Sequence, residues 1–254
     1  MATFAFITGA TSGFGEAIAR QFAATGKNLI ITGRRGDRLL KLKNELQGLF
    51  PGIHCIISNF DVRIENDVQK AINDIPTEIT SNIDVLINNA GLAVGRGPID
   101  EGISDDWDRM VDTNIKGLLY VSKAVIPFLK KHKHAHIVNI ASIAGKEVYL
   151  GGNVYCATKH AVDALSRAMR IDLLPFGIKV SNIAPGAADT EFSVVRFKGN
   201  LETARAVYEG YTPLFANDIA DAVLYVCSRP AHVTINDLVI MPTAQASATN
   251  LAKD

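Results

Sequence analysis

The chain has 254 residues, and its 26 Lys and Arg residues balance its 26 Asp and Glu residues, so the formal net charge is zero. This length is enough for one large α/β domain with a substantial buried core. The balanced charge argues against a general nucleic-acid or anionic-membrane surface. No apolar run approaches the roughly 18 residues that a membrane-spanning helix needs. We therefore expect neither nucleic acid nor membrane among the partners of this chain.

Cysteine usage and the N-terminal residues indicate a reducing compartment. The three cysteines, Cys55, Cys156 and Cys227, form no CxxC pair, and their odd number argues against a disulfide framework. The apolar start MATFAFITGA lacks a basic leading segment and runs directly into a Gly-rich turn. It therefore predicts a first strand and not a signal peptide. We expect a cytoplasmic protein.

Short β-rich runs alternate with longer helical stretches along the whole chain. Strands are expected over residues 4–8, 28–32, 53–58, 84–88, 136–140, 179–183 and 237–240. They are apolar on both faces, as in a parallel sheet that helices cover on each side. Strand–helix alternation implies right-handed crossovers and a doubly wound sheet. Because no composition break divides the chain, we predict one domain over residues 1–254, with an irregular lid around 186–217.

A glycine-rich turn follows the first predicted strand and opens the first predicted helix. It reads TGATSGFG, with the spacing GxxxGxG. Missing Cβ atoms let such a turn fold tightly and approach a pyrophosphate, at which the following helix points its N-terminus. Glycine clusters occur in many turns, but this placement between strand and helix favours a dinucleotide site. The expected cofactor contacts in the turn are Gly9, Thr11, Ser12, Gly13, Phe14 and Gly15.

The end of the second strand bears on the choice of dinucleotide. An NAD site usually carries an acid there to bond the ribose hydroxyl, but here Gly33 takes its place and Arg34 and Arg35 follow. Two guanidinium groups would bind a 2′-phosphate with charge-assisted forked bonds. The alternative is a solvated basic start to the next helix. Because the acid is absent as well as the arginines present, we predict NADP as the cofactor.

Tyr155 and Lys159 are spaced i and i+4, so a helix would place both side chains on one face. A phenol with a pKa near 10 is a poor base at neutral pH, and a nearby ammonium group lowers that pKa. This YxxxK pattern alone is common by chance. It is joined here by Ser142 after the fifth strand, Asn114 in a helical stretch, and the motif NNAG at 88–91. Further along, Pro185 and Gly186 follow the sixth strand, and Asp61 and Val62 end the third.

Taken together and in order, these motifs resemble those of the classical short-chain dehydrogenase/reductase family, and the resemblance covers almost the whole chain. It implies a Rossmann-type sheet of about seven parallel strands with helices on both faces. It also implies an enzyme that moves a hydride between NADP and an alcohol or carbonyl substrate. Because the helices beside the sheet pack across two-fold axes in this family, a homotetramer is expected. The C-terminal stretch PTAQASATNLAKD is a candidate arm toward a neighbouring subunit.

The resemblance also assigns roles to individual residues. Tyr155 exchanges a proton with the substrate oxygen, and Ser142 holds that oxygen. Lys159 lowers the Tyr155 pKa and bonds the nicotinamide ribose, while Asn114 supports a water that relays protons to Lys159. Asp61 would bond the adenine, Asn88 would line its ribose, and Gly186 and Thr190 would reach the carboxamide. The cofactor contacts implied in this way are Asp61, Val62, Asn88, Ala90, Gly91, Tyr155, Lys159, Pro185, Gly186 and Thr190.

Shorter segments narrow the substrate class. The stretches GLAVGRGP, LGGNVY, TEFSVVRFKG and MPTAQ resemble those of NADP-dependent 3-hydroxy acid dehydrogenases, which act on serine, allo-threonine, 3-hydroxypropionate or malonic semialdehyde. Such a substrate needs a cation for its carboxylate, and a guanidinium suits a planar carboxylate best. We expect Arg196 to bind the substrate with Ser142 and Tyr155, with Lys198 as the alternative. The competing interpretation is that Arg196 and Lys198 are both exposed charges of the lid that bind no substrate. The loop GAADTEF departs from the expected pattern and puts the lid geometry in doubt.

Other functions stay open at this point. One is a reductase of another carbonyl, such as a 3-oxoacyl thioester or a bulky ketone. Another is a non-enzymatic NADPH sensor, against which the set of Asn114, Ser142, Tyr155 and Lys159 argues, since a sensor needs no proton-transfer group. Alternating histidines at 132, 134 and 136 could converge on a metal, but no Cys or carboxylate joins them. We therefore expect no metal.

Overall fold

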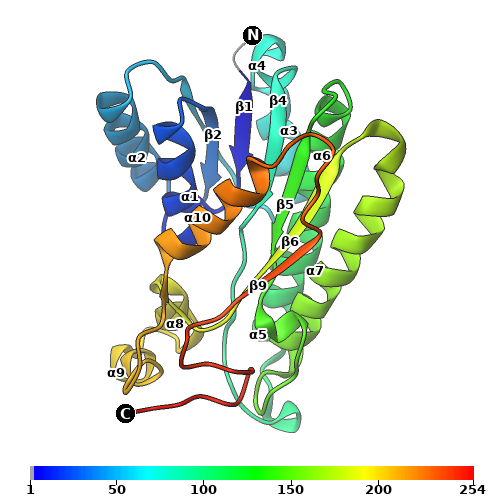
Figure 1. Cartoon of the computed structure of the whole chain (residues 1–254). Coiled ribbons are helices and arrows are strands. Elements are labelled where there is room, and N and C mark those ends of the chain that lie inside the picture. The colour runs from blue at the N-terminus through cyan, green and yellow to red at the C-terminus, as the bar shows by residue number, and fades with distance from the viewer. Residues whose placement is uncertain (1–2) are drawn as a thin grey trace.

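The computed structural model describes residues 3–254, and within this range seven parallel strands form one central sheet (Figure 1). The strand order is β3-β2-β1-β4-β5-β6-β9. The strands are β1 (Phe4–Ile7), β2 (Asn28–Gly33), β3 (Cys55–Asn59), β4 (Ile83–Asn88), β5 (His136–Ile140), β6 (Lys179–Pro185) and β9 (Asp237–Ile240). The predicted doubly wound, Rossmann-type sheet is thereby confirmed. Five of the seven strands begin or end one or two residues away from the predicted bounds. At β6 the difference reaches the site, because Pro185 is the last residue of the strand and pairs with Ile240.

The direction of winding reverses beside β1, which pairs with β2 on one side and β4 on the other. Ligands of open α/β sheets bind beyond the carboxyl ends of the strands next to such a reversal. The glycine-rich turn leaves β1 there, and the NNAG segment leaves β4. The topology therefore brings these two motifs to the same edge of the sheet.

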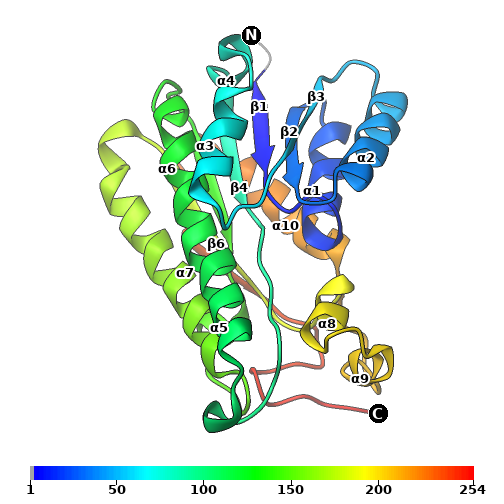
Figure 2. The same cartoon turned by 180° about the vertical axis from the view of Figure 1, so that it is seen from behind.

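Helices cover both faces of the sheet, and each face has its own apolar core (Figures 1 and 2). Buried side chains of α1, α2 and α10 pack on one face, and those of α3, α6 and α7 pack on the other. The longer helices are α1 (Gly13–Ala24), α2 (Gly36–Leu49), α3 (Glu65–Asn73), α5 (Ser104–Val111), α6 (Leu118–Leu129), α7 (Asn153–Asp172) and α10 (Ala216–Cys227). Short turns are α4 (Thr77–Thr80), η1 (Ile99–Glu101), η3 (Ile143–Gly145) and η4 (Leu174–Phe176). None of the helices in the described range is long and apolar enough to cross a membrane.

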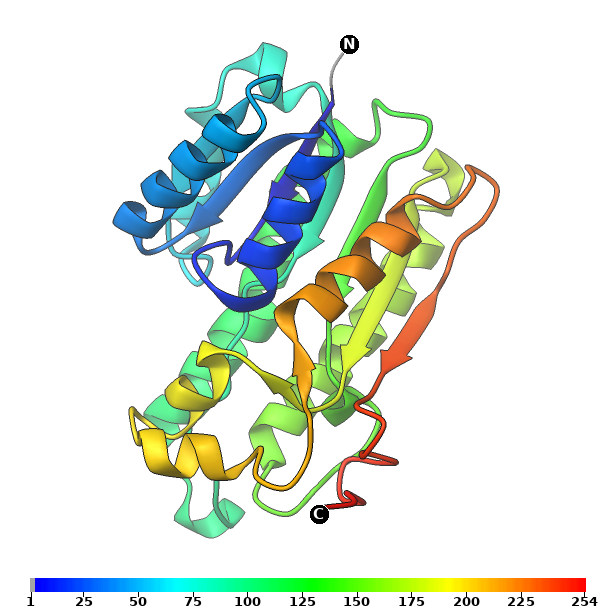
Figure 3. The ribbon, with the colours of Figure 1, turned by 60° about the vertical axis from the view of Figure 1, so that its left-hand side comes forward.

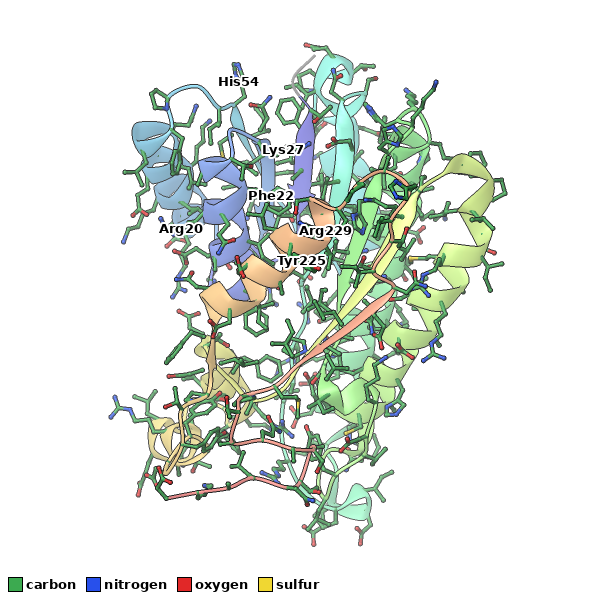
Figure 4. The ribbon with its side chains drawn as sticks, in the orientation of Figure 1. Arg20, Phe22, Lys27, His54, Tyr225 and Arg229 are labelled. Carbon is green, nitrogen blue, oxygen red and sulfur yellow. The ribbon has the colours of Figure 1, made fainter. Side chains whose placement is uncertain are left out.

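The contact between α1 and α10 closes one face of the sheet. Phe22 of α1 is buried in the same core as Ile219 and Val223 of α10. On the outer side of α10, the guanidinium of Arg229 lies over the ring of Tyr225, 4.1 Å from its centroid. Figure 4 labels Phe22 of α1, Tyr225 of α10 and Arg229, which follows the end of α10. The packing of α1 against α10 holds α10, and with it the end of the lid, against the first βα unit.

The helical stretch around Asn114 is less regular than its sequence indicates. Between α5 and α6 the chain forms a π-helical turn, η2 (Asp112–Gly117), which contains Asn114. Single π turns within helices are frequent at functional sites because they break the regular hydrogen-bond ladder. Gly117, the last residue of this turn, packs closely on Val62, and a Cβ on Gly117 would lie 2.8 Å from the Val62 side chain.

The segment expected to be an irregular lid is instead built from short regular elements. They are β7 (Ala188–Asp189), α8 (Glu191–Arg196), α9 (Leu201–Ala206) and β8 (Leu214–Phe215), and β7 pairs with β8 in parallel. Figure 3 shows this lid, in yellow to orange, beyond the carboxyl ends of the strands. The C-terminal stretch lies against the lid of its own chain, where the backbone N–H of Asp254 donates to the carbonyl of Gly210 over 2.9 Å.

Candidate active site

The turn after β1 needs glycine at three positions. Gly9 and Gly13 have φ angles of +67° and +55°, in the left-handed region that residues with a Cβ rarely adopt. A Cβ on Gly15 would lie 2.3 Å from the carbonyl oxygen of Gly9. Because α1 begins at Gly13, its first free N–H groups open onto the space in front of the turn. This cradle fits the pyrophosphate of a dinucleotide.

Asn89, which the sequence analysis did not single out, joins the NNAG segment to the turn. Its Nδ2 donates to the carbonyls of Thr8 and Gly9 over 2.9 and 3.2 Å. In return, the backbone N–H groups of Asn89 and Ala90 both donate to Thr8 Oγ1 over 3.0 Å. These bonds fix the ends of β1 and β4 relative to each other. The position of Asn89 inside the NNAG motif was the signal for this role.

Arg35 reaches from the end of β2 to the hydroxyl groups of the turn. Its Nε and Nη2 donate to Thr11 Oγ1 over 3.1 and 2.8 Å, and Nη2 also donates to Ser12 Oγ over 2.8 Å. A Cβ at Gly33 would lie 2.6 Å from Thr11 Cγ2, so an acid at position 33 would collide with the turn. A guanidinium beside two hydroxyls is a donor set that fits a 2′-phosphate.

Arg34 turns toward Asp61 instead. Its Nη1 lies 3.8 Å from Asp61 Oδ2, and Arg63 Nη2 donates to the same oxygen over 2.6 Å. Burial opposes ionisation of Asp61, but the hydrogen bonds and charge of Arg63 outweigh it and hold the pKa of this carboxyl below its usual range. The carboxylate expected to bond the adenine is therefore already engaged by arginines.

Asn114 and Lys159 meet beside Gly91. Asn114 holds the backbone of Leu92 from both sides, accepting from its N–H and donating to its carbonyl over 2.8 Å each. Its Nδ2 also donates to Thr158 Oγ1 on α7 over 3.0 Å. A Cβ on Gly91 would lie 3.3 Å from Asn114 Oδ1 and 3.5 Å from Lys159 Nζ, so the missing side chain leaves room between them. Asn114 thus positions the chain after NNAG against the helix that carries Lys159.

Lys159 is buried, and its Nζ donates to the carbonyl of Ile140 at the end of β5 over 2.9 Å. Burial lowers the pKa of its ammonium group to about 8. The Nζ lies 5.9 Å from the ring centroid of Tyr155, one helical turn away. The group is therefore still charged at neutral pH and close enough to act on the Tyr155 phenol.

Tyr155 is enclosed by three different elements. It lies in the first turn of α7, and the ring of Phe192 from the lid stands 5.6 Å away. Burial and the neighbouring Tyr149 raise the pKa of the phenol, while a hydrogen bond with Ser142 and the charge of Arg196 lower it. Ser142 itself follows β5 and caps η3, where its Oγ accepts from the N–H of Ala144 over 3.1 Å. The net effect of the surroundings is a neutral phenol in the free protein.

Arg196 is the cation that the lid places at this centre. Its guanidinium carbon lies 5.5 Å from the ring centroid of Tyr155 and 5.4 Å from that of Tyr149, and its buried Nε has no hydrogen-bond partner in the described structure. Lys198 is engaged elsewhere, because its Nζ lies 2.7 Å from Oδ2 of the buried Asp106. In the described structure Arg196 therefore has an unpaired donor that a ligand could bond, whereas Lys198 is already paired with Asp106.

A cavity of about 280 Å³ opens beside Tyr155. Its wall combines polar and apolar side chains, among them Trp107, Met110, Asn153, Tyr155 and Lys198. Asn153 is held in place by its Nδ2, which donates to the carbonyl of Gly97 over 3.0 Å. The space suits a small substrate whose hydroxyl or carbonyl group meets the phenol.

The Pro185–Gly186 segment is held by the C-terminal part of the chain. The N–H of Gly186 donates to the carbonyl of Ile240 over 2.7 Å, and Gln245 Oε1 accepts from the N–H of Ala187 over 2.8 Å. A Cβ on Gly186 would lie 2.5 Å from Gln245 Oε1. Thr190 caps α8 and lies next to the turn, 3.4 Å from where a Gly13 Cβ would be.

Two of the predicted cofactor residues, Asn88 and Val62, have side chains that are buried inside the protein. Asn88 is buried, and its Nδ2 donates to Ser122 Oγ and Asn139 Oδ1 over 2.9 Å each. Val62 is buried in the core beneath α3 and α6 and packs against Gly117. Their contribution to a ligand would come from the backbone. The phosphate turn, Arg35 and Ser142 follow the carboxyl ends of β1, β2 and β5, and Lys159 bonds the last residue of β5.

This arrangement provides the parts of a proton-transfer site next to a dinucleotide cradle. Tyr155 supplies an ionisable hydroxyl, Lys159 supplies a positive charge behind it, and Ser142 supplies a second hydroxyl at the same place. The described residues contain no group of three His, Cys, Asp or Glu side chains that would hold a metal ion.

Known proteins share both the sequence and the fold. NADP-dependent 3-hydroxy acid dehydrogenase YdfG of Escherichia coli O6:H1 is 45% identical over 243 residues, covering 95% of this chain and 96% of that protein. Sulfoacetaldehyde reductase 2 of Chromohalobacter salexigens is 44% identical over 247 residues, covering 97% and 96%. The closed form of a serine dehydrogenase complexed with NADP+ matches with a TM-score of 0.91 at 42% identity, over 99% of this chain and 100% of that one.

The match to the family model covers most of the chain. Residues 3–200 match the family described as short chain dehydrogenase, and this range contains the glycine-rich turn, NNAG, Ser142 and the Tyr155–Lys159 pair. The chain belongs to the short-chain dehydrogenase family.

Proposed function

We propose that this protein is an NADP-dependent dehydrogenase of small 3-hydroxy acids, of the serine, allo-threonine or 3-hydroxypropionate type. The observation that carries the proposal is the position of Arg196, whose guanidinium lies over the ring of Tyr155. A substrate whose carboxylate meets Arg196 would bring its own hydroxyl within reach of the phenol. The name of the YdfG relative and that of the serine dehydrogenase structure support the same substrate class.

In this function each residue of the site has its own role. Tyr155 exchanges the proton of the substrate hydroxyl, and Ser142 donates to or accepts from the same oxygen. Lys159 keeps a positive charge behind the phenol and stabilises its ionised form. Asn114 holds Leu92 and α7 in register, and Arg196 fixes the acid group. The glycine-rich turn and Arg35 would hold the dinucleotide, and its nicotinamide would supply the hydride-transfer chemistry.

The cofactor assignment rests on the end of β2. Gly33 leaves no room for the acid of an NAD site, and Arg35 is directed at Thr11 and Ser12. Arg34 adds a second positive charge on the adenine side. A 2′-phosphate would therefore meet a guanidinium and two hydroxyls, whereas an unphosphorylated ribose would leave this donor set without an acceptor.

The nature of the anionic group is the main alternative within this function. A sulfonate would satisfy Arg196 as well as a carboxylate does, and one relative is named for sulfoacetaldehyde. A 3-oxoacyl thioester or a bulky ketone would have no partner for Arg196. A sensor without activity would not need Tyr155 and Lys159 on one helical face.

A substrate screen of the purified enzyme tests the proposal. L-Serine, L-allo-threonine, 3-hydroxypropionate and 2-hydroxyethanesulfonate are offered with NADP+ and with NAD+, and a neutral alcohol of similar size serves as the control. We expect turnover of 3-hydroxy acids with NADP+ and much lower kcat/KM for the neutral alcohol. Good reduction of neutral ketones with no turnover of any acid would reject the substrate class and leave the dehydrogenase assignment in place.

We also propose a homotetramer in the cytoplasm. Exposed apolar side chains at the end of α7 and in the following turn, Ile171, Leu174 and Phe176, support a subunit contact on that side. The free thiols of Cys55, Cys156 and Cys227 are consistent with a reducing compartment. Light scattering at micromolar concentration would measure the assembly, and a monomeric mass would refute it.

A further inference from the structure

An acidic side chain of the lid contacts the arginines next to the glycine-rich turn. Glu191, the first residue of α8, places Oε2 2.9 Å from Arg35 Nη1 and Oε1 2.6 Å from Arg38 Nη1. Arg35 is thereby divided between two sets of acceptors. Its Nε and Nη2 donate to the hydroxyls of Thr11 and Ser12, and its Nη1 donates to the carboxylate of Glu191.

A second contact shows that the lid lies directly on the turn at this point. Thr190, the residue before Glu191, would stand 3.4 Å from a Cβ on Gly13. The Glu191 carboxylate therefore contacts the same arginine that bonds the hydroxyls of the turn, next to the point where the lid touches the turn. The side chains of Glu191 and Arg35 are 48% and 40% exposed, so their ion pair can exchange for another anion from solution.

The charges around Glu191 also favour its ionised form. Burial raises its pKa, but the hydrogen bonds and charges of Arg38 and Arg35 outweigh this effect and hold the pKa below its usual value. At neutral pH the two arginines thus already face one negative charge, supplied by the protein itself.

We propose that Glu191 is a specificity-determining residue that competes with the 2′-phosphate of the dinucleotide for Arg35 and Arg38. The inference rests on the proposed use of NADP. A 2′-phosphate must displace the carboxylate or share the arginines with it, and either process weakens its binding. An unphosphorylated dinucleotide needs neither arginine and is unaffected. Glu191 therefore moderates the NADP preference that Arg35 creates, and phosphate binding releases the first residue of α8 from its ion pairs.

The opposite role would be that Glu191 orients Arg35 for the phosphate. The two roles predict effects of opposite sign, because removing a competitor tightens phosphate binding and removing an orienting group weakens it. Direct binding of cofactor fragments separates them without any turnover.

The test is calorimetric titration of 2′,5′-ADP and 5′-AMP into the wild type, Glu191→Gln and a matched lid variant, Glu202→Gln. Glu202 is an exposed acid of α9. We expect Glu191→Gln to bind 2′,5′-ADP about twofold to tenfold more tightly, as the loss of two exposed ion pairs implies, with 5′-AMP unchanged. Glu202→Gln should bind both ligands like the wild type. NADP+ and NAD+ should repeat the pattern.

Weaker or unchanged binding of 2′,5′-ADP by Glu191→Gln would overturn the inference. A further check uses Arg35→Ala as the background, in which Glu191→Gln should have a smaller effect on 2′,5′-ADP because one of the two contested arginines is gone. Full persistence of the effect there would count against competition at Arg35. A wild type that binds 2′,5′-ADP no better than 5′-AMP would refute the NADP assignment and, with it, the competition.

Discussion

The guanidinium carbon of Arg196 lies 5.5 Å from the ring centroid of Tyr155, although the two residues belong to the lid and to α7. The rings of Tyr155 and Tyr149 hold the guanidinium in place, and its buried Nε has no acceptor in the described structure. A buried donor without a partner is costly, and a bound anion would supply the missing acceptor. The proton-transfer group and the anion-binding group are thus spaced for one small molecule.

Arg196→Ala should raise KM for L-serine or 3-hydroxypropionate and lower kcat/KM about 10- to 100-fold, the usual range for a lost charge-assisted bond. A neutral alcohol of similar size should lose far less, because it presents no anion to the lid. Arg205→Ala, at an exposed arginine of α9, is the matched control and should behave like the wild type. Equal losses for charged and neutral substrates would show that Arg196 only shapes the lid.

Tyr155→Phe keeps the ring but removes the hydroxyl. Turnover should fall by about 10²- to 10⁴-fold or more, the range for a general acid–base group. NADPH binding, followed by its fluorescence, should stay close to that of the wild type. Tyr225→Phe makes the same change on the outer side of α10 and should leave both properties intact. Near-full activity of Tyr155→Phe would reject the mechanism.

The pH dependence of the wild type follows from the same group. Burial raises the pKa of Tyr155 in the free protein, so the phenol is protonated at neutral pH and ready to donate in the reductive direction. Oxidation needs the ionised form, and its rate should therefore rise with pH. Initial rates in both directions between pH 6 and 10 check this. An oxidation rate that falls with rising pH across neutrality would contradict it.

Arg35→Ala should weaken NADP+ by about 10- to 100-fold and leave NAD+ nearly unchanged, because only NADP+ brings a phosphate to the guanidinium. Arg34→Ala should act in the same direction. Since Arg34 is more exposed and leans toward Asp61, we expect the smaller loss there. Arg229→Ala, on the far side of α10, is the control. A wild type with equal kcat/KM for the two cofactors would refute the preference itself.

The family and the sheet were predictable because their signals are local. Apolar strands, a glycine-rich turn and the motifs NNAG and YxxxK each occupy a few consecutive residues, and the comparisons confirm the family and the fold that they imply. The proposed cofactor and substrate class also had local signals, and the names of the relatives support both. The individual site residues stay predictions, although the structure brings most of them to one edge of the sheet. The homotetramer also stays a prediction.

Other features had no local signal. The π turn at Asn114 needs only a shifted hydrogen-bond pattern, which composition does not reveal. Helices of six residues, such as α8, are too short to show periodicity. Glu191 meets Arg35 across 156 positions of sequence, and Gln245 meets Ala187 across 58. Contacts of this kind depend on how the lid and the C-terminal stretch fold back, and only the three-dimensional structure gives them.

The last prediction concerns stability and His136, the first residue of β5. Its ring is buried, Nε2 bonds Ser181 Oγ over 2.8 Å, and burial with the nearby charge of Lys179 lowers its pKa to about 3. Between pH 6.5 and 3 the unfolded chain binds a proton at this site and the folded chain does not, so stability falls as the pH falls through this window. At pH 5 the loss relative to pH 7 should be about 2 kcal/mol.

His136→Asn removes the titrating group. The free energy of unfolding of this variant should therefore fall by that much less between pH 7 and pH 5, whatever its own stability at pH 7. His54→Asn, at an exposed histidine labelled in Figure 4, is the control. Denaturant unfolding at pH 7 and pH 5 gives the free energy of unfolding of all three proteins. If the wild type and His136→Asn lose the same free energy of unfolding between pH 7 and pH 5, His136 is not the titrating group.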